Sequence, residues 1–152
     1  MSFRTIRAAS AALAMLVLLP AMAAAAEITV YKSPYCGCCG AWVKHMKDHG
    51  HDVKTVEMED LTAIKRMTGV AEPLQSCHTA VVDGYVIEGH VPASDVARLL
   101  QNKPKARGLA VPGMPVGSPG MEGPAPQAYD VLLFQTDGST TVYARHQGKQ
   151  TP

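Results

Sequence analysis

The sequence predicts an α/β fold, because short alternating segments typical of strands are interleaved with segments of helical period. In the first strand, "EITVYK" (27–32), isoleucine and valine alternate with polar neighbours. From Gly37 to His49 apolar residues recur at helical spacing, and Gly50 follows as a natural helix stop. Later, "TAVVDGYVIEGHV" (79–91) places apolar runs on both sides of an Asp-Gly pair, which is typical of a β-hairpin.

The same patterns assign the elements between and after these segments. "HDVKTVEM" (51–58) predicts a second strand, and residues 61–68 predict a short helix that Gly69 ends. After the hairpin, Ser94 is expected to cap a helix that runs to Leu100. Composition then changes: residues 103–127 are rich in Gly and Pro, which excludes regular helix or sheet and indicates a long loop.

The last segment, "YDVLLFQTDGSTTVYARH" (129–146), predicts a second hairpin around another Asp-Gly pair. A strand followed by cysteines at a helix start, with a later hairpin and helix, is the order of a thioredoxin-like α/β sandwich. We therefore expect such a sandwich with an added Gly/Pro-rich loop and a C-terminal β-hairpin.

The N-terminus has the layout of a secretory signal peptide at residues 1–26. Two arginines precede an apolar run from Ala8 to Leu19, and an Ala-x-Ala sequence allows cleavage after Ala26. The run is short for a membrane span, which needs about 20 residues. We therefore expect export to the periplasm and one mature domain at residues 27–152, with no membrane attachment after cleavage.

The charge of the chain argues against a nucleic-acid partner. It has 14 Lys and Arg against 13 Asp and Glu, and cleavage would remove two of the arginines, so the mature chain is close to neutral. A nucleic-acid binder normally carries a basic patch, and a protein held at an anionic membrane surface carries a polybasic stretch. Neither pattern occurs in this sequence.

Four cysteines carry the strongest functional signal. Cys36, Cys38 and Cys39 stand at the predicted strand-to-helix turn, and Cys77 precedes a histidine much later. Disulfides are the ordinary use of cysteine in an oxidising compartment. Here a bridge between adjacent cysteines would be strained, and bridges within so short a stretch close almost no loop. A helix start also favours the thiolate, which is both a nucleophile and a metal ligand.

Disulfide exchange is one use of this cluster. Cys36 and Cys39 form a C-x-x-C pair, which in a thioredoxin-like fold is the motif of a thiol–disulfide oxidoreductase. Such an enzyme gains nothing obvious from Cys38 and Cys77, since extra nucleophiles invite wrong pairings. The sequence therefore leaves copper or thiol oxidoreductase activity open.

Metal binding uses all four sulfurs, Cys36, Cys38, Cys39 and Cys77. Soft thiolates select Cu(I), Zn(II) or iron–sulfur clusters. Zinc normally takes two pairs of C-x-x-C type, and that spacing is absent here. Cu(I) accepts two or three thiolates and allows bridging sulfurs, which suits adjacent cysteines. We therefore predict copper, with Cu(I) favoured and one or more ions bound.

Three further residues are candidate metal ligands. His78 adjoins Cys77, and Met114 and Met121 lie in the Gly/Pro-rich loop, where core packing is a weaker explanation for a thioether. His45 and His49 have chelate spacing on one helix, although a solvated helix face explains them more simply. Trp42 is expected to pack in the core. The sequence offers no role for His90.

Three stretches, "YKSPYCGCCGAWVKHM", "SCHTAVVDGYVIEGHVPA" and "VPGMPVGSPGME", resemble the CopG-type family of exported bacterial copper-resistance proteins. The resemblance extends from Glu27 to about Tyr143. It implies a thioredoxin-like fold, a role in copper tolerance, and a copper site. The implied ligands are Cys36, Cys38, Cys39 and Cys77.

The sequence thus predicts a periplasmic copper-binding protein that contributes to copper resistance by holding Cu(I) on clustered thiolates, with copper redox activity as an extension. Its partners would be copper ions and other periplasmic copper proteins. The alternative is a thiol–disulfide oxidoreductase that uses Cys36 and Cys39. A zinc-stabilised structural module is a third class, in which metal removal would unfold the chain.

Overall fold

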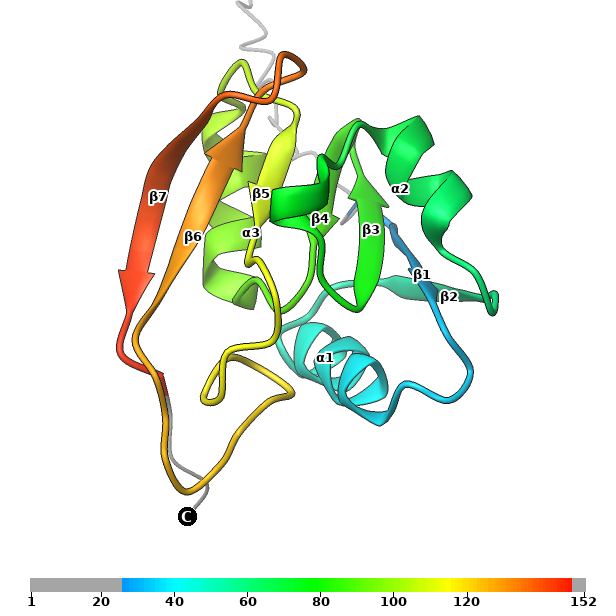
Figure 1. Cartoon of the computed structure of the whole chain (residues 1–152), viewed down its shortest axis with the longest axis vertical. Coiled ribbons are helices and arrows are strands. Elements are labelled where there is room, and N and C mark those ends of the chain that lie inside the picture. The colour runs from blue at the N-terminus through cyan, green and yellow to red at the C-terminus, as the bar shows by residue number, and fades with distance from the viewer. Residues whose placement is uncertain (1–25, 149–152) are drawn as a thin grey trace, which may run out of the picture.

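The computed structural model describes residues 26–148, and within them seven strands form one sheet in the order β2-β1-β3-β4-β5-β6-β7. β1 and β2 are parallel, as are β4 and β5, and the other neighbours are antiparallel (Figure 1). The helices and strands are β1 (Ile28–Lys32), α1 (Gly37–Asp48), β2 (Val53–Glu57), α2 (Thr62–Thr68), the 3₁₀ helix η1 (Glu72–Leu74), β3 (His78–Val82), β4 (Tyr85–Glu88), α3 (Ala93–Asn102), β5 (Gly108–Ala110), β6 (Tyr129–Phe134) and β7 (Thr140–His146).

The predicted α/β class is confirmed, and both Asp-Gly pairs form hairpin turns. Asp83 and Gly84 have φ angles of 48° and 82°, as a two-residue hairpin turn requires. This turn pairs Val82 with Tyr85 and thereby sets the register of β3 and β4. The predicted cap at Ser94 is wrong, because the N-cap of α3 is Pro92, two residues earlier, and it provides no side-chain hydrogen bond.

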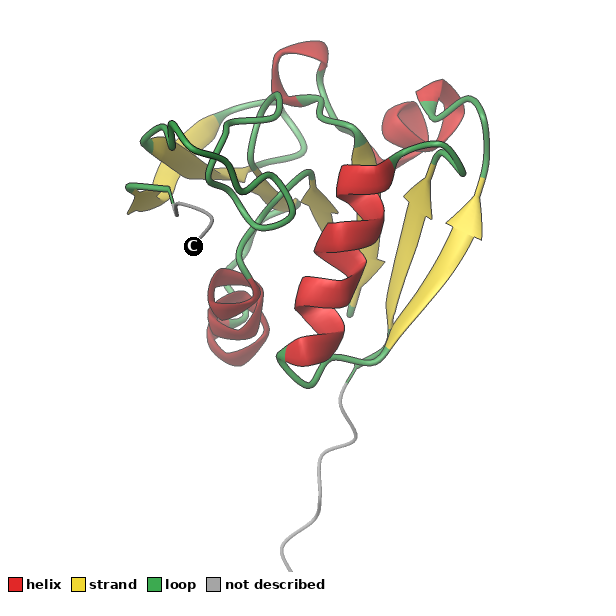
Figure 2. Ribbon diagram, turned by 90° about the horizontal axis from the view of Figure 1, so that it is seen from below, coloured by secondary structure: helices red, strands yellow, loops and turns green. Residues whose placement is uncertain are grey.

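Helices cover both faces of the sheet (Figure 2). α1 and α3 lie on one face, where Trp42, Met46 and Leu99 are fully buried together with inward-pointing strand residues such as Ile87. On the other face, Leu74 of η1 packs in a smaller cluster with strand residues. The two clusters follow from the alternation of side chains along each strand.

Trp42 packs in the core, as the sequence predicted. Its ring is fully buried, and its indole Nε1–H donates a hydrogen bond of 2.8 Å to the carbonyl of Val91. A buried indole normally needs such a partner. This bond attaches α1 to the segment that leads from β4 into α3.

One prediction about the Gly/Pro-rich segment is wrong. Residues 103–127 were expected to contain no strand, yet β5 lies within them and joins β4 to β6. The strand is short, and its backbone groups are satisfied on both sides by neighbours that the chain supplies from elsewhere. Strand formation here therefore depends on the sheet around it rather than on local pattern.

Gly108 allows β5 to lie close to β4. It pairs with Val86, and a Cβ on Gly108 would lie 1.8 Å from the Val86 carbonyl oxygen. A glycine in a strand often marks such a close backbone approach. No larger residue fits without moving one strand of the sheet.

The predicted signal peptide at residues 1–26 lies almost entirely outside the described residues, so that prediction stays untested. Within residues 26–148, none of the helices is long and apolar enough to cross a membrane.

Replacing Gly108 with alanine should lower the free energy of unfolding by about 1–3 kcal/mol, because the added methyl group overpacks the β4–β5 contact. Urea unfolding followed by circular dichroism measures this change. Gly40→Ala is the matched control: nothing lies within 4 Å of its added Cβ, and alanine in a helix should stabilise by about 0.5–1 kcal/mol. Equal stability of Gly108→Ala and the original protein would contradict the close approach.

Candidate metal centre

Three cysteines are placed by the turn between β1 and the first residues of α1. The Cys36 N–H donates to the Ser33 carbonyl at 3.1 Å, which closes this turn. Cys36 is the N-cap of α1, and its sulfur accepts the N–H of Cys39 at 3.3 Å. Sulfur atoms therefore lie at the positive end of the helix dipole, where negative charge is stabilised.

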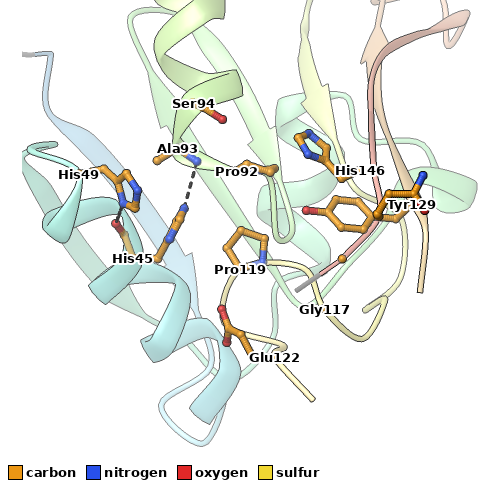
Figure 3. A pocket seen from close by; sticks show the side chains of 12 residues that line it. His45, His49, Pro92, Ala93, Ser94, Gly117, Pro119, Glu122, Tyr129 and His146 are labelled. Carbon is orange, nitrogen blue, oxygen red and sulfur yellow. Dashed lines mark hydrogen bonds between the residues drawn. The ribbon is translucent and has the colours of Figure 1, made fainter. Parts of the chain in front are cut away.

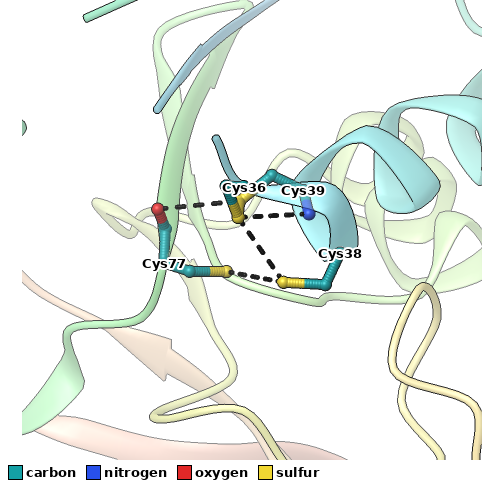
Figure 4. A group of neighbouring side chains, drawn as sticks. All are labelled: Cys36, Cys38, Cys39 and Cys77. Atoms are coloured by element: carbon teal, nitrogen blue, oxygen red, sulfur yellow. Dashed lines mark hydrogen bonds between the residues drawn. A yellow bond between two sulfur atoms is a disulfide. The ribbon is translucent and has the colours of Figure 1, made fainter. Parts of the chain in front are cut away.

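Cys77, which precedes β3, lies next to this turn because of the way β3 pairs with β1. Lys32 at the end of β1 pairs with His78 at the start of β3, so the residue before His78 faces the turn after Lys32. The Cys38 and Cys77 sulfurs are 4.0 Å apart (Figure 4). All four cysteine sulfurs lie within 4.8 Å of one another, so the structure brings together the four predicted ligands.

The C-x-x-C pair is oxidised in the structure. Cys36 and Cys39 form a disulfide with a Cα–Cα distance of 5.3 Å, whereas Cys38 and Cys77 are free thiols. The Cys38 sulfur lies 3.5 Å from that of Cys36. The oxidised cluster thus offers two thiols to a metal, and reduction of the disulfide would double that number.

The surroundings of Cys77 disfavour its thiolate. Burial, together with the neighbouring Cys38, raises the pKa of the Cys77 thiol to about 12. The thiol therefore keeps its proton at neutral pH unless a cation at the sulfur displaces it. A coordinated thiol is deprotonated by the metal itself, so metal binding at Cys77 should release a proton.

His78, a predicted candidate ligand, lies beside Cys77 but points partly into the core. Its Nδ1 is 3.4 Å from the Cys77 sulfur, and its ring centroid is 4.5 Å from that of Trp42. Its Nε2 is buried and has no hydrogen-bond partner among the described residues. Burial, and then the charges of His90 and Lys65, lower the pKa of His78 well below its usual value, so the ring is neutral.

His90, to which the sequence assigned no role, is also at the site. Its Nε2 lies 2.9 Å from the Cys77 sulfur, and Cys77, His78 and His90 form a second group with donor atoms within 4.8 Å of one another. Counting from the Asp83–Gly84 turn would have found it. A two-residue turn pairs 82 with 85, so the extended register places residue 77 opposite residue 90.

The two candidate methionines are placed differently. Met114 is 52% exposed at the surface. Met121 closes a turn in which its carbonyl accepts the Gly117 N–H at 2.7 Å. The preceding Gly120, with a φ of 84°, packs so closely that a Cβ would lie 2.8 Å from the Cys38 carbonyl oxygen. The turn that contains Met121 therefore lies against the cysteine end of α1.

A buried ionic network holds the loop that carries Cys77. The Glu88 carboxylate accepts the Ser76 N–H at 2.7 Å and pairs with the Lys65 ammonium at 2.5 Å. The Thr79 hydroxyl donates to the same carboxylate at 2.6 Å. Every oxygen of Glu88 thus has a partner, as a buried charge requires, and Ser76 is fixed one residue before Cys77.

A cavity of about 290 Å³ has Pro119 in its lining and none of the four cysteines (Figure 3). His45 and His49, which have chelate spacing in the sequence, line it with Glu122 and His146. The two imidazole centroids of His45 and His49 are 4.3 Å apart, and His45 Nε2 accepts the Ala93 N–H at 3.1 Å. This contact connects α1 with the start of α3.

Residues 74–121 match the family described as "Protein of unknown function, DUF411". A solved structure titled "Copper resistance protein copG- Form 2" is 42% identical, with a TM-score of 0.77, and the match covers 81% of this chain and 99% of that one. A second, "Copper resistance protein copG- Form 1", is 43% identical, with a TM-score of 0.75 and coverages of 80% and 98%. Among curated proteins, none matches this chain.

Alkylation of Cys77 should be slow in the folded protein. Only the thiolate reacts, and the pKa of the Cys77 thiol is about 12. At pH 8 the thiolate fraction is roughly 10³-fold smaller than that of an unperturbed thiol with a pKa of about 8.5. The rate should rise about tenfold per pH unit until the pKa is approached. To measure this rate, native and urea-unfolded protein are treated with iodoacetamide, and the alkylated fraction of the Cys77 peptide is then determined by mass spectrometry. Equal native and unfolded rates at pH 8 would show that Cys77 is not protected.

Proposed function

The chain belongs to the family of the copper resistance protein CopG, and from this premise we propose that it holds copper on its clustered cysteine thiolates. The observation that carries the proposal is the convergence of four sulfurs, within 4.8 Å, from two segments almost forty residues apart. A disulfide exchanger needs two of these sulfurs, whereas a metal site uses all four. Copper resistance follows if bound copper is kept from other reactions.

Cu(I) is the ion that the donor set favours. Thiolates are soft ligands, and among the biologically common cations they select Cu(I) and Zn(II). Zinc prefers four tetrahedral ligands, whereas Cu(I) is satisfied by two or three and shares sulfurs between ions. Cys38 and Cys39 are adjacent, which hinders both from serving one tetrahedral ion. One or more Cu(I) ions therefore suit Cys36, Cys38, Cys39 and Cys77 best.

The oxidation state of the cysteines would control copper uptake. In the Cys36–Cys39 disulfide neither sulfur carries the charge of a thiolate ligand. A dithiol reductant can deliver two electrons and two protons to this bond, which yields two thiols and leaves the reductant as a disulfide. Each thiol then loses its proton as it binds copper. Sequestration as a thiolate complex suppresses reaction of Cu(I) with oxygen species and with other proteins.

A thiol–disulfide oxidoreductase is the second candidate, and the disulfide itself is the observation that favours it. In that function Cys36 and Cys39 would exchange their bond with a partner's thiols, and Cys77 would be an accessory thiol. The Cys38 sulfur, 3.5 Å from Cys36, would then compete for the same bond. The thioredoxin-like arrangement that the sequence predicts suits either function.

We further propose that the protein acts in the periplasm after removal of residues 1–26. The support is the layout of the leader in the sequence and the compartment in which a cysteine pair can be oxidised. Copper ions, and other periplasmic copper proteins that deliver or accept them, would be its partners. The loop with Met114 and Met121 would lie over the bound copper.

The reduced protein should take up Cu(I) under anaerobic conditions in competition with bicinchoninate, a coloured chelator. Cys77→Ser should weaken that affinity at least about a hundredfold, because it removes a ligand that connects the two segments. Met67→Leu is the control, since it removes an exposed thioether on α2 that is not one of the predicted ligands and should leave the affinity unchanged.

Cys38→Ser separates the two candidate functions. It should cripple copper uptake and spare a two-cysteine exchanger. Weak uptake by the intact protein, combined with strong disulfide reductase activity that survives Cys38→Ser, would replace copper binding with disulfide exchange as the function.

The proposed export and cleavage can be tested by cell fractionation and mass spectrometry. Cell fractionation should place the protein in the periplasmic fraction, and mass spectrometry should find an N-terminus at Glu27, because an Ala-x-Ala site precedes it. Deleting residues 2–19 should leave the protein in the cytoplasm. An intact Met1 on protein in the cytoplasmic fraction would refute the predicted cleavage.

A further inference from the structure

The cavity that contains no cysteine is built from three parts of the chain. His45 and His49 come from α1 and its C-terminal end, Glu122 comes from the Gly/Pro-rich segment, and Tyr129 and His146 are the first residue of β6 and the last of β7. Its volume of about 290 Å³ is close to the lower limit of small-molecule sites, which is about 300 Å³. The proposed function uses none of these five side chains, so the cavity needs its own explanation.

His146 is held in this cavity by a buried carboxylate. Its Nε2 lies 2.6 Å from Asp95 Oδ2, and the other Asp95 oxygen accepts from Arg98 at 2.9 Å. A carboxylate accepts hydrogen bonds, so Nε2 carries the ring proton and Nδ1 of the neutral imidazole presents a lone pair. The ring also stacks on Tyr129, with centroids 5.2 Å apart. Nδ1 has no hydrogen-bond partner within residues 26–148 and is not enclosed by them, so it can accept from a ligand.

Two more groups at the cavity are hydrogen-bond acceptors. His49 Nδ1 lies 2.7 Å from the His45 carbonyl oxygen, so Nδ1 is the donor and Nε2 keeps its lone pair. One oxygen of Glu122 accepts the Gly120 N–H at 2.9 Å, which leaves the second oxygen for a ligand. The cavity therefore offers mainly acceptors, and a matching ligand must be rich in donors.

The charge at the cavity favours a cation. Glu122 lines it, and neither lysine nor arginine is among the described residues of its lining. Burial, and then the charges of Asp95 and Glu122, raise the pKa of Tyr129 to about 12, so its hydroxyl stays neutral. This hydroxyl is directed into the cavity, towards Pro92 and Pro119 (Figure 3). A negative potential that disfavours a phenolate at this position stabilises a positive charge there.

A metal ion matches this lining less well than an organic cation. Apart from the cysteine cluster and the group of Cys77 with its two histidines, no three His, Cys, Asp or Glu donor atoms in residues 26–148 lie within 4.8 Å of one another. His45 Nε2 already accepts the Ala93 N–H at 3.1 Å, and His49 Nδ1 is bonded to the His45 carbonyl. The chelate spacing of these two histidines therefore does not give a chelate.

We propose that this cavity binds a small organic cation, an ammonium group carried on an apolar body, at a site separate from the metal centre. An ammonium group has three N–H donors and no acceptor, which matches the lone pairs of His49 and His146 and the carboxylate of Glu122. Pro92 and Pro119 supply apolar contact for the carbon part of the ligand. This inference goes beyond the proposed function and does not depend on it.

Three probes of similar size and different charge test the proposal: benzylammonium, benzyl alcohol and benzoate. Each is titrated at pH 8 into the metal-free protein, and backbone amide shifts are followed by NMR. Benzylammonium should bind with a Kd of about 1 mM or tighter, and the amides of Ala93 and Gly117, which line the cavity, should shift. Benzyl alcohol should bind at least about tenfold more weakly, because a hydrogen bond to a charged group is stronger than a neutral one. Benzoate should not saturate.

A pair of variants locates the charge that the ligand recognises. Glu122→Gln keeps an oxygen for the Gly120 N–H and removes the negative charge, so benzylammonium affinity should fall at least about tenfold. Glu72→Gln is the matched control, because Glu72 is an exposed acid on η1 that does not line the cavity, and it should leave the affinity unchanged.

Four results would overturn the proposal. These are equal affinity for the three probes, preference for benzoate, shifts confined to amides outside the cavity, and an unchanged affinity in Glu122→Gln. The first three come from the original protein and do not depend on how well a variant folds. A Zn(II) titration of the variant with both Cys38→Ser and Cys77→Ser covers the other class of cation. Shifts of the cavity amides at a lower concentration of Zn(II) than of benzylammonium would assign the cavity to a metal ion instead.

Discussion

The antiparallel register between β1 and β3 is the constraint on which the site depends. It pairs Lys32 with His78 and so sets Cys77 against the turn that carries the other three cysteines. The β3–β4 hairpin extends the same register and sets His90 opposite Cys77. A shift of one residue would turn every side chain of β3 to the other face of the sheet. Two segments distant in sequence therefore form one site because backbone hydrogen bonds align them.

Buried polar groups keep this alignment specific. The Lys65–Glu88 pair lies on the face opposite α1, and its carboxylate holds the Ser76 N–H. A buried ion pair is weak evidence of stability, because desolvation costs about as much as the attraction gives. The pair instead fixes the position of the backbone before Cys77. A buried carboxylate must keep its hydrogen-bond partners, and the Ser76 N–H is one of the partners of Glu88. The chemistry of the cluster thus relies on a charge that never touches it.

The Gly/Pro-rich segment contributes both to the sheet and to the candidate metal site. Its first part enters the sheet as β5, where Gly108 permits close contact with β4. Its later part forms the turn that holds His90 through the Pro119 carbonyl and packs Gly120 against α1. Residues that prevent regular structure are needed in this second part, because the turn requires positive φ at Gly117 and Gly120. The same segment therefore completes the sheet and shapes the site.

The sequence by itself determined most of the helices and strands, both Asp-Gly hairpins and the two cysteine segments, because periodicity and turn chemistry reflect short-range interactions. The place of His90 opposite Cys77 was also readable, by counting from the Asp83–Gly84 turn. Only the tertiary structure decided that β5 is a strand, that Glu88 holds Ser76, and that Pro119 orients His90. These contacts join segments whose proximity depends on the order of strands in the sheet, and local pattern carries no information about that order.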